Sequence, residues 1–178
     1  IEERKIAEEE LTKSEQRLSF VVEGSRLGTW DWDIENNKVH RNTLWAEMLG
    51  YSIEEIEGTH ESWIKLIQAE DRERVTSEIA AHQAGKTPTY EIIYRIRTKQ
   101  NTYKWILDRA MIVQRDAAGK PLRMSGTHTD ITERKNAEQA LQKSEERIRL
   151  LLESLPISIY ISPLNSDIDV EMITGNVK

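Results

Sequence analysis

Histidine and cysteine are the residue types that most often supply nucleophiles, general bases and metal ligands, and this chain of 178 residues offers them in no usable pattern. It has no cysteine, and His40, His60, His82 and His128 stand too far apart for a local metal-binding motif. The sequence contains no glycine-rich phosphate loop, no Gly-x-Ser-x-Gly elbow and no paired-histidine zinc helix. We therefore predict no catalytic residue, no metal site and no enzyme activity in this chain.

Aromatic side chains could do chemistry of another kind, by lining a cavity for a flat ligand. All five tryptophans fall in the middle of the chain, and Val75, Ile79 and His82 recur on one face of a helix expected over 70–85. Such residues more commonly fill a core, so both interpretations stay open. The candidate lining residues are Trp30, Trp32, Trp45, Val75, Ile79, His82, Tyr94, Trp105 and Met111.

Asp130 is a candidate for a functional role that is not catalytic. It ends a strand expected over 122–131 and precedes a helix. Its carboxylate can accept a hydrogen bond from the backbone N–H of Thr132 or Glu133 and so cap that helix.

The helices that flank these residues carry nearly the same sequence. Residues 1–24 and 131–154 match at 12 of 24 positions in unbroken register, at an offset of 130 residues. Charged helices resemble one another by composition, but unbroken register favours a true repeat. Because 130 residues suit one domain with its connector, we expect a piece of a tandem array.

Both copies predict a helix with a narrow apolar seam. Apolar and small residues recur at alternating spacings of three and four, which is typical of a coiled coil. A helix lying on its own domain is the alternative. We predict a homodimer through both helices, and the seam residues are Ala7, Leu11, Leu18, Leu141, Ile148 and Leu151.

Between the two copies, the sequence predicts two strands, several short helices and three more strands. Residues 27–42 alternate tryptophan with aspartate and turn at Asn36 and Asn37. Asn42 and Ser52 can cap short helices. A helical segment over 61–68 and the longer helix over 70–85 follow.

The last three strands are expected over 89–101, 102–116 and 122–131. Adjacent hairpins imply an antiparallel sheet with helices on one face, which is an α+β fold. The strand over 102–116 is apolar on both faces, so the helix over 1–24 or a partner subunit is expected to cover the second face.

Composition limits the partners. The formal net charge is −6 with acids and bases interleaved, so no basic stripe suits nucleic acid. No apolar run approaches the roughly 18 residues that span a bilayer, and no signal peptide is present. We expect a cytoplasmic location and no membrane contact for these residues, although the full-length protein could be membrane-anchored.

The pattern resembles the PAS family of sensory domains, in the subclass whose last three strands carry the PAC motif. The matching segments are GTWDWD (28–33), LGYS (49–52), ESWIKLIQAEDRERV (61–75), YEIIYRIRTKQNTYKWI (90–106) and DAAGKPLRMSGTHTDITERK (116–135). The resemblance implies a five-stranded antiparallel sheet of order 2-1-5-4-3, with short helices closing a pocket over one face. It also implies that Asp130, Ile131 and Thr132 couple the sheet to the helix that follows.

The resemblance sets the expected domain boundaries. Residues 1–18 would be a connector helix from a preceding domain, and residues 19–131 the PAS domain with its PAC motif. Residues 132–153 would be a signalling helix, and residues 154–178 the first strands of a following, truncated PAS domain.

Family cofactors can be tested against the residues. The flavin photoadduct of some members needs a cysteine, which this chain lacks, so that chemistry is excluded. Haem-binding members resemble one another in placing a histidine at the position that aligns with Val75. His82 lies two turns later on the same face. No cofactor is predicted, and the alternatives left open are a haem ligand at His82 and an unknown small molecule.

We expect a sensory domain of a bacterial signalling protein that acts through dimeric helices on an effector such as a histidine kinase of a two-component system or a cyclic-dinucleotide enzyme. Adjacent PAS domains and the effector would lie in the same chain. The alternatives are a ligand-free dimerisation or spacer module and, less favoured, a haem- or flavin-binding redox or gas sensor.

Overall fold

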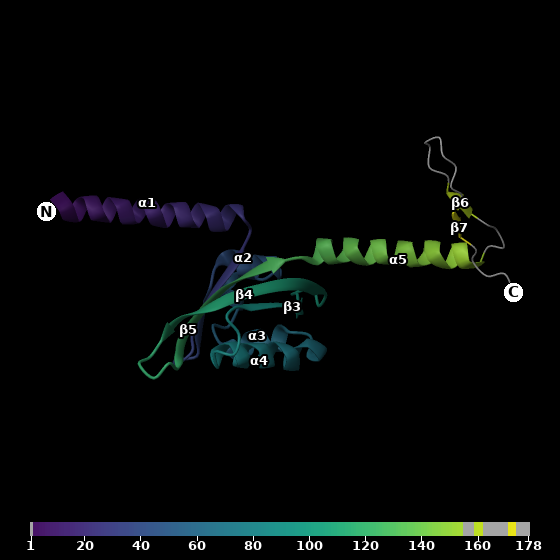
Figure 1. The fold of residues 1–178 in the computed structure, drawn as a ribbon. Helices are drawn as coiled ribbons and strands as arrows, with labels where there is room; N and C mark the ends of the chain where they lie inside the picture. The colour runs from purple at the N-terminus through teal and green to yellow at the C-terminus, as the bar shows by residue number, and fades with distance from the viewer. Residues whose placement is uncertain (1, 155–158, 162–170, 174–178) are drawn as a thin grey trace. The chain divides into compact units, whose positions relative to one another are not determined.

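The fold is built on a five-stranded antiparallel sheet of strand order β2-β1-β5-β4-β3 (Figure 1). The computed structural model describes residues 2–154, 159–161 and 171–173. The strands are β1 (Gly28–Asp33), β2 (Lys38–Arg41), β3 (Tyr90–Arg97), β4 (Tyr103–Arg115) and β5 (Pro121–Asp130). The predicted α+β class and the predicted 2-1-5-4-3 order are confirmed.

Two of the hairpin turns lie where the sequence predicts them. Asn37 between β1 and β2 has a φ of 51°, and Asn101 between β3 and β4 has a φ of 62°. Asparagine tolerates this left-handed conformation better than most residues. The turn positions fix the register of both hairpins.

Short helices connect β2 to β3. Asn42 caps the first by accepting a hydrogen bond from the Trp45 backbone N–H (3.0 Å), and its side chain also accepts from the Thr29 backbone N–H in β1 (2.9 Å). The segment after Ser52 forms a single 3-10 turn, because the backbone is already extended at Ile56. The helical elements are α2 (Thr43–Met48), η1 (Ile53–Glu55), α3 (His60–Leu66) and α4 (Ala69–Gln83).

The core lies between these helices and one face of the sheet. Figure 1 shows α3 and α4 running along β3 and β4. Alternate residues of β3 are buried, as a strand with one covered face requires. The largest side chains that are almost fully buried are Trp45, Leu49, Ile67, Tyr94, Ile96, Ile106 and Met124.

The opposite face of β4 is apolar and partly open. Tyr103, Met111 and Val113 are 46%, 62% and 47% exposed, whereas Leu107 on the same face is buried. Cover of this face by the helix over 1–24 or by a partner subunit stays a prediction.

The flanking helices are α1 (Glu2–Gly24) and α5 (Thr132–Ser154). The chain divides into two compact units, Ile1–Thr132 and Glu133–Lys178. All six predicted seam residues are exposed, the five leucine and isoleucine side chains by more than half. No helix among the described residues is long and apolar enough to cross a membrane.

Beyond α5, β6 (Ile159–Ile161) pairs with β7 (Glu171–Ile173) as an antiparallel ribbon. The remainder of the segment predicted to begin a following PAS domain lies outside the described residues. Its assignment to such a domain stays a prediction.

Candidate functional site

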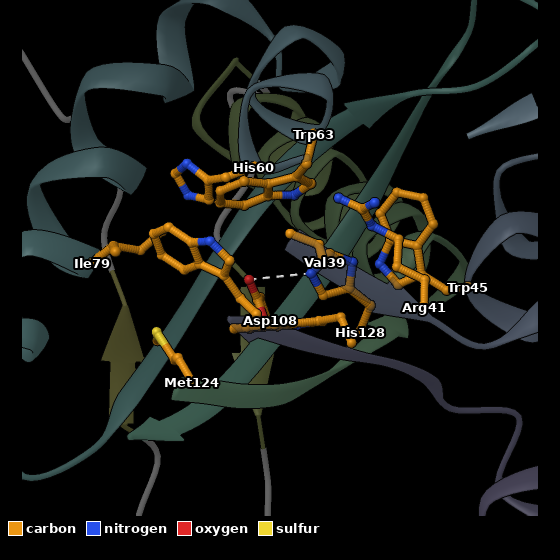
Figure 2. A pocket seen from close by; sticks show the side chains of 11 residues that line it. Val39, Arg41, Trp45, His60, Trp63, Ile79, Asp108, Met124 and His128 are labelled. Carbon is orange, nitrogen blue, oxygen red and sulfur yellow. Dashed lines mark hydrogen bonds and ion pairs between the residues drawn. The ribbon is translucent and has the colours of Figure 1, made fainter. Parts of the chain in front are cut away.

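A cavity of about 30 Å³ lies on the helix-covered face of the sheet. The lining side chains come from β1, β2, β4 and β5 and from α2, α3 and α4, and Figure 2 shows side chains of the lining around the cavity. Asn42 positions one wall, because it ties the start of α2 to β1 and so holds Trp45 over the sheet. The lining residues are Trp30, Trp32, Val39, Arg41, Trp45, His60, Trp63, Ile79, Asp108, Met124 and His128.

Asp108 is the centre of a buried hydrogen-bond network in the cavity wall. Its Oδ1 accepts from the Trp30 indole N–H (3.0 Å), and its Oδ2 accepts from the Tyr94 hydroxyl (3.0 Å). The same Oδ2 lies 3.2 Å from His128 Nε2 and 3.4 Å from the Tyr90 hydroxyl. Asp108 is 1% exposed and His128 2%. A buried carboxyl group is tolerated only with such partners, so this network satisfies the hydrogen-bonding groups of Asp108 inside the core.

Strand register brings these groups together. Asp108 in β4 lies directly opposite His128 in β5, and both follow the phase of the inward-facing residues of their strands. Tyr94 reaches the pair from β3, and its hydroxyl accepts a hydrogen bond from the Trp63 indole of α3 (3.1 Å). Burial, and then the neighbouring Asp108 charge, raise the pKa of Tyr94 well above its ordinary value. Tyr94 therefore stays a donor to Asp108.

Arg41 brings a positive charge to the cavity. Its guanidinium lies 4.7 Å from the centre of the Trp45 ring, a cation–π contact. Its Nη1 and Nη2 each donate to a backbone carbonyl, those of Glu57 and Thr59 (both 3.1 Å). Burial lowers the pKa of Arg41 to about 10, so the side chain remains charged at neutral pH.

His60 and Trp32 form a flat stack at the edge of the cavity. Their rings lie 4.0 Å apart and only 5° from parallel. Burial lowers the pKa of His60 and outweighs the opposing effect of Glu61, so the ring is neutral at neutral pH. A neutral imidazole offers one donor and one acceptor nitrogen.

The structure brings four of the nine predicted lining residues to the cavity: Trp30, Trp32, Trp45 and Ile79. Val75, Tyr94 and His82 are buried in the core outside the lining. Trp105 and Met111 lie on the other face of the sheet, because odd-numbered residues of β4 point away from the face that carries Ile106 and Asp108.

Sequence reasoning missed Arg41, His60, Trp63, Asp108 and His128, which supply most of the polar chemistry of the lining. One signal was available. Asp108 shares its strand phase with Ile106 and Ala110, and a charged residue in an inward phase marks a buried polar site.

The lining does not fit haem or flavin. Pockets that enclose ligands of drug size measure about 300 Å³ or more, roughly ten times this cavity. Val75, at the aligned haem-ligand position, is fully buried, and His82 Nδ1 lies 3.0 Å from the Thr87 carbonyl oxygen. No cluster of three metal-ligating side chains occurs among the residues described. We derive no step through either cofactor.

A second candidate site, the exit junction, joins the sheet to the start of α5 and comprises Lys104, Trp105, Asp130, Ile131 and Thr132. Asp130 Oδ1 accepts from the Thr132 backbone N–H (2.9 Å), and its Oδ2 lies 2.8 Å from Lys104 Nζ. The Trp105 N–H donates to Thr132 Oγ1 (3.0 Å), and the Ile131 N–H donates to the Trp105 carbonyl (2.9 Å). The capping contact predicted for Asp130 is therefore present.

Asp130 is ionised at neutral pH. Burial by itself raises its pKa, but hydrogen bonds from Lys104 and Thr132 outweigh burial and hold the pKa below the ordinary value of an aspartate. Ile131 is buried, which anchors the chain between the cap and the sheet. The role of Asp130, Ile131 and Thr132 in coupling stays a prediction.

A family model described as PAS fold matches residues 38–128. The Sensor protein FixL of Bradyrhizobium diazoefficiens is 28% identical over 140 residues, which cover 79% of this chain and 27% of the relative. The Blue-light-activated histidine kinase of Brucella ovis is 30% identical over 137 residues, which cover 76% of this chain and 26% of the relative. The chain thus spans about a quarter of the length of these relatives.

Solved structures share the fold. A sensory box histidine kinase/response regulator from Burkholderia thailandensis superposes with a TM-score of 0.65 at 32% identity, covering 75% of this chain and 98% of that one. The N-terminal domain of a diguanylate cyclase with PAS/PAC sensor from Marinobacter aquaeolei gives a TM-score of 0.55 at 22% identity, covering 61% and 98%.

Proposed function

The chain belongs to the PAS family, and from this premise we propose that residues 19–131 are a non-catalytic sensory domain whose state is relayed through α5 to an effector in the same protein. A role in sensory signalling follows from relatives that are named as a sensor protein and as histidine kinases. The proposed effector is a histidine kinase or a cyclic-dinucleotide enzyme. Adjacent PAS domains in a tandem array are part of the same proposal.

The observation that carries this proposal is the exit junction. Asp130 binds Lys104 of β4 and the first backbone N–H of α5 through its two carboxylate oxygens. Thr132 in turn accepts a hydrogen bond from the Trp105 backbone. A displacement of β4 relative to β5 would therefore change contacts at the first residue of α5.

The cavity and the exit junction share two strands. The cavity-wall pair, Asp108 and His128, lies two positions along each strand from the pair of Ile106 and Asp130, with one pair of residues between them. Any change that alters the Asp108–His128 contact has only this short paired segment to cross before it reaches the cap. We propose this segment as the path from the cavity to the helix.

Replacing Asp130 with alanine in the full-length protein tests the relay. We expect effector output, measured as autophosphorylation or dinucleotide synthesis, to change by about fivefold or more, the range typical of coupling between sites. Loss of the cap should also cost about 0.5–2 kcal/mol of stability.

Asp33→Ala is the matched control for Asp130→Ala. Asp33 likewise accepts hydrogen bonds from a nearby backbone N–H and a side chain, both of Asn36, in the β1–β2 turn. The effector output of Asp33→Ala should stay within about twofold of the parent. Asp33 lies at the β1–β2 turn and outside the exit junction, so an effect smaller than the typical coupling of about fivefold between sites is expected. Equal output from Asp130→Ala and the parent would contradict the relay.

A second candidate function is a dimerisation or spacer module, and the exposed seam on α1 and α5 favours dimerisation in either case. Leu11, Leu18, Leu141, Ile148 and Leu151 are each more than half exposed. Isolated helices with only two or three heptads are marginal in water, and pairing with a second copy would bury these side chains.

Light scattering on the chain at high micromolar concentration tests the seam. We expect a dimer, and we expect Leu141→Glu to make it monomeric because the substitution places a charge in the seam. Gln142→Glu adds the same charge at the neighbouring exposed position and should leave the dimer intact. A monomeric parent chain would contradict the seam.

A further inference from the structure

Three buried nitrogen atoms around the cavity have no hydrogen-bond partner. Among the described residues, five buried side-chain nitrogen or oxygen atoms are unpartnered, and three of them, Trp32 Nε1, Trp45 Nε1 and His60 Nε2, belong to the cavity lining. The other two tryptophans of the lining are satisfied, since Trp30 donates to Asp108 and Trp63 donates to Tyr94. Buried polar groups are rarely left unpaired in native proteins, so this concentration in one cavity indicates a partner from outside the chain.

Arg41 adds a charge that lacks a counter-ion. Within the part of the chain that the structure describes, no carboxylate lies within ion-pair distance of its guanidinium. Two of its five N–H groups donate to backbone carbonyls, which leaves three. Asp108 is the carboxylate of the lining, and Trp30, Tyr94 and His128 already occupy its oxygens. The cavity therefore has free donors and an uncompensated positive charge.

We infer that the cavity binds a small carboxylate. A carboxylate is planar and has two acceptor oxygens, which suits the fork of a guanidinium and the indole N–H groups of Trp32 and Trp45. The carbon end would lie against the apolar walls formed by Val39, Ile79 and Met124. This inference deepens the proposed function, because a bound carboxylate would be the input that the relay transmits.

The size of the cavity selects a short acid. A cavity needs roughly 10–15 Å³ to hold one water, so about 30 Å³ admits a carboxylate with a short carbon end and little beyond it. Trp30, Trp32, Arg41 and His60 are only partly buried and form the rim. A longer acid would need these rim side chains to move.

Other small occupants match the site less well. Water can accept hydrogen bonds from the indoles but cannot compensate the charge of Arg41. Phosphate is tetrahedral, larger than a carboxylate and carries more than one negative charge at neutral pH, whereas Arg41 supplies one positive charge to this small cavity. A neutral amide has the shape of a carboxylate without its charge, and so separates shape from charge in a binding test.

Tryptophan fluorescence of the whole chain is the first measurement, because four tryptophans line the cavity. We expect acetate to give a saturable change in the millimolar range at constant ionic strength, and we expect acetamide and phosphate to give none. No saturable change with acetate would overturn the inference. An equal response to acetamide, or a response to phosphate alone, would also overturn it.

Two variants locate the binding. Arg41→Gln should weaken acetate binding about tenfold or more, as expected for a charged hydrogen bond, and Trp32→Phe about threefold by removing one N–H group. Arg72→Gln is the matched control, because Arg72 also donates only to backbone carbonyls but is exposed and lies outside the lining. It should bind acetate like the parent.

Circular dichroism establishes that each variant is folded. If Arg41→Gln does not fold, Trp32→Phe decides, since it keeps an aromatic side chain at this position and removes the N–H donor. Unchanged acetate affinity in the folded variants would overturn the site. Acetate binding is measured without an effector, so the two tests are independent. Absence of acetate binding would not contradict the relay through Asp130, and an unchanged effector output in Asp130→Ala would not contradict the carboxylate site.

Discussion

Asp108→Ala is expected to lower the free energy of unfolding by about 3–5 kcal/mol, because each buried donor left without an acceptor costs about 1–3 kcal/mol. Trp30 and Tyr94 would lose the acceptor that Asp108 provides, and His128 Nε2 would retain its contact with the Tyr94 hydroxyl (3.0 Å). A small domain has about 5–15 kcal/mol in total. The variant should therefore be partly unfolded at moderate temperature.

Urea denaturation followed by circular dichroism measures this loss. Glu91→Ala is the control, because Glu91 forms its ion pair with Arg109 at the surface, where the two side chains are 54% and 58% exposed. Exposed pairs contribute about 0–1 kcal/mol, so this variant should unfold close to the parent. Asp108→Ala unfolding within about 1 kcal/mol of the parent would mean that the network is not stabilising.

The sheet could be predicted because its determinants are local in sequence. Alternation along β3 and the asparagines at 37 and 101 fix where strands lie and where they turn. The sequence also predicts the helix cap formed by Asn42. It does not predict the second hydrogen bond of this side chain, which accepts from the Thr29 backbone N–H in β1. Strand order came from the family resemblance, since no local pattern encodes which strands become neighbours.

The polar site could not be predicted because it depends on register between distant strands. Strand ends expected at 116 and 122 would place Asp108 opposite Asp130. The structure instead pairs Arg115 with Pro121, and that shift of two residues puts Asp108 opposite His128. The predicted end of a strand is often wrong by about one or two residues. Here such an error gives Asp108 the wrong partner in β5.

The aromatic residues show a different limit. Residue type alone predicts that Trp105 and Met111 line the cavity together with Tyr94, because all three side chains are large and mainly apolar. Tyr94 pairs with Ile106, so residues of β4 in the phase of Ile106 share its face and Trp105 and Met111 do not. Phase along the strand therefore separates cavity from outer surface, whereas residue type alone does not.

Gly126→Ala is the second large effect that we expect, a loss of about 3 kcal/mol, at the upper end of the usual cost of overpacking. Gly126 sits in β5 between Ala110 of β4 and Trp30 of β1. A Cβ atom there would lie 2.7 Å from Ala110 Cβ and from the Trp30 ring, and closer still to the Arg109 carbonyl oxygen. Real Cβ atoms do not approach so closely, so either the sheet backbone or the Trp30 ring must move.

Movement of the Trp30 ring would also strain its hydrogen bond to Asp108. The absence of a side chain at Gly126 therefore helps to preserve the hydrogen-bond network of Asp108. Thermal unfolding measures the loss, with Gly24→Ala at the end of α1 as the control, since a Cβ at Gly24 meets nothing within 4 Å. The double variant Gly126→Ala, Trp30→Ala should recover little stability, because the clash with the Arg109 carbonyl remains. Full recovery would place the whole cost in the Trp30 contact and would contradict a backbone clash.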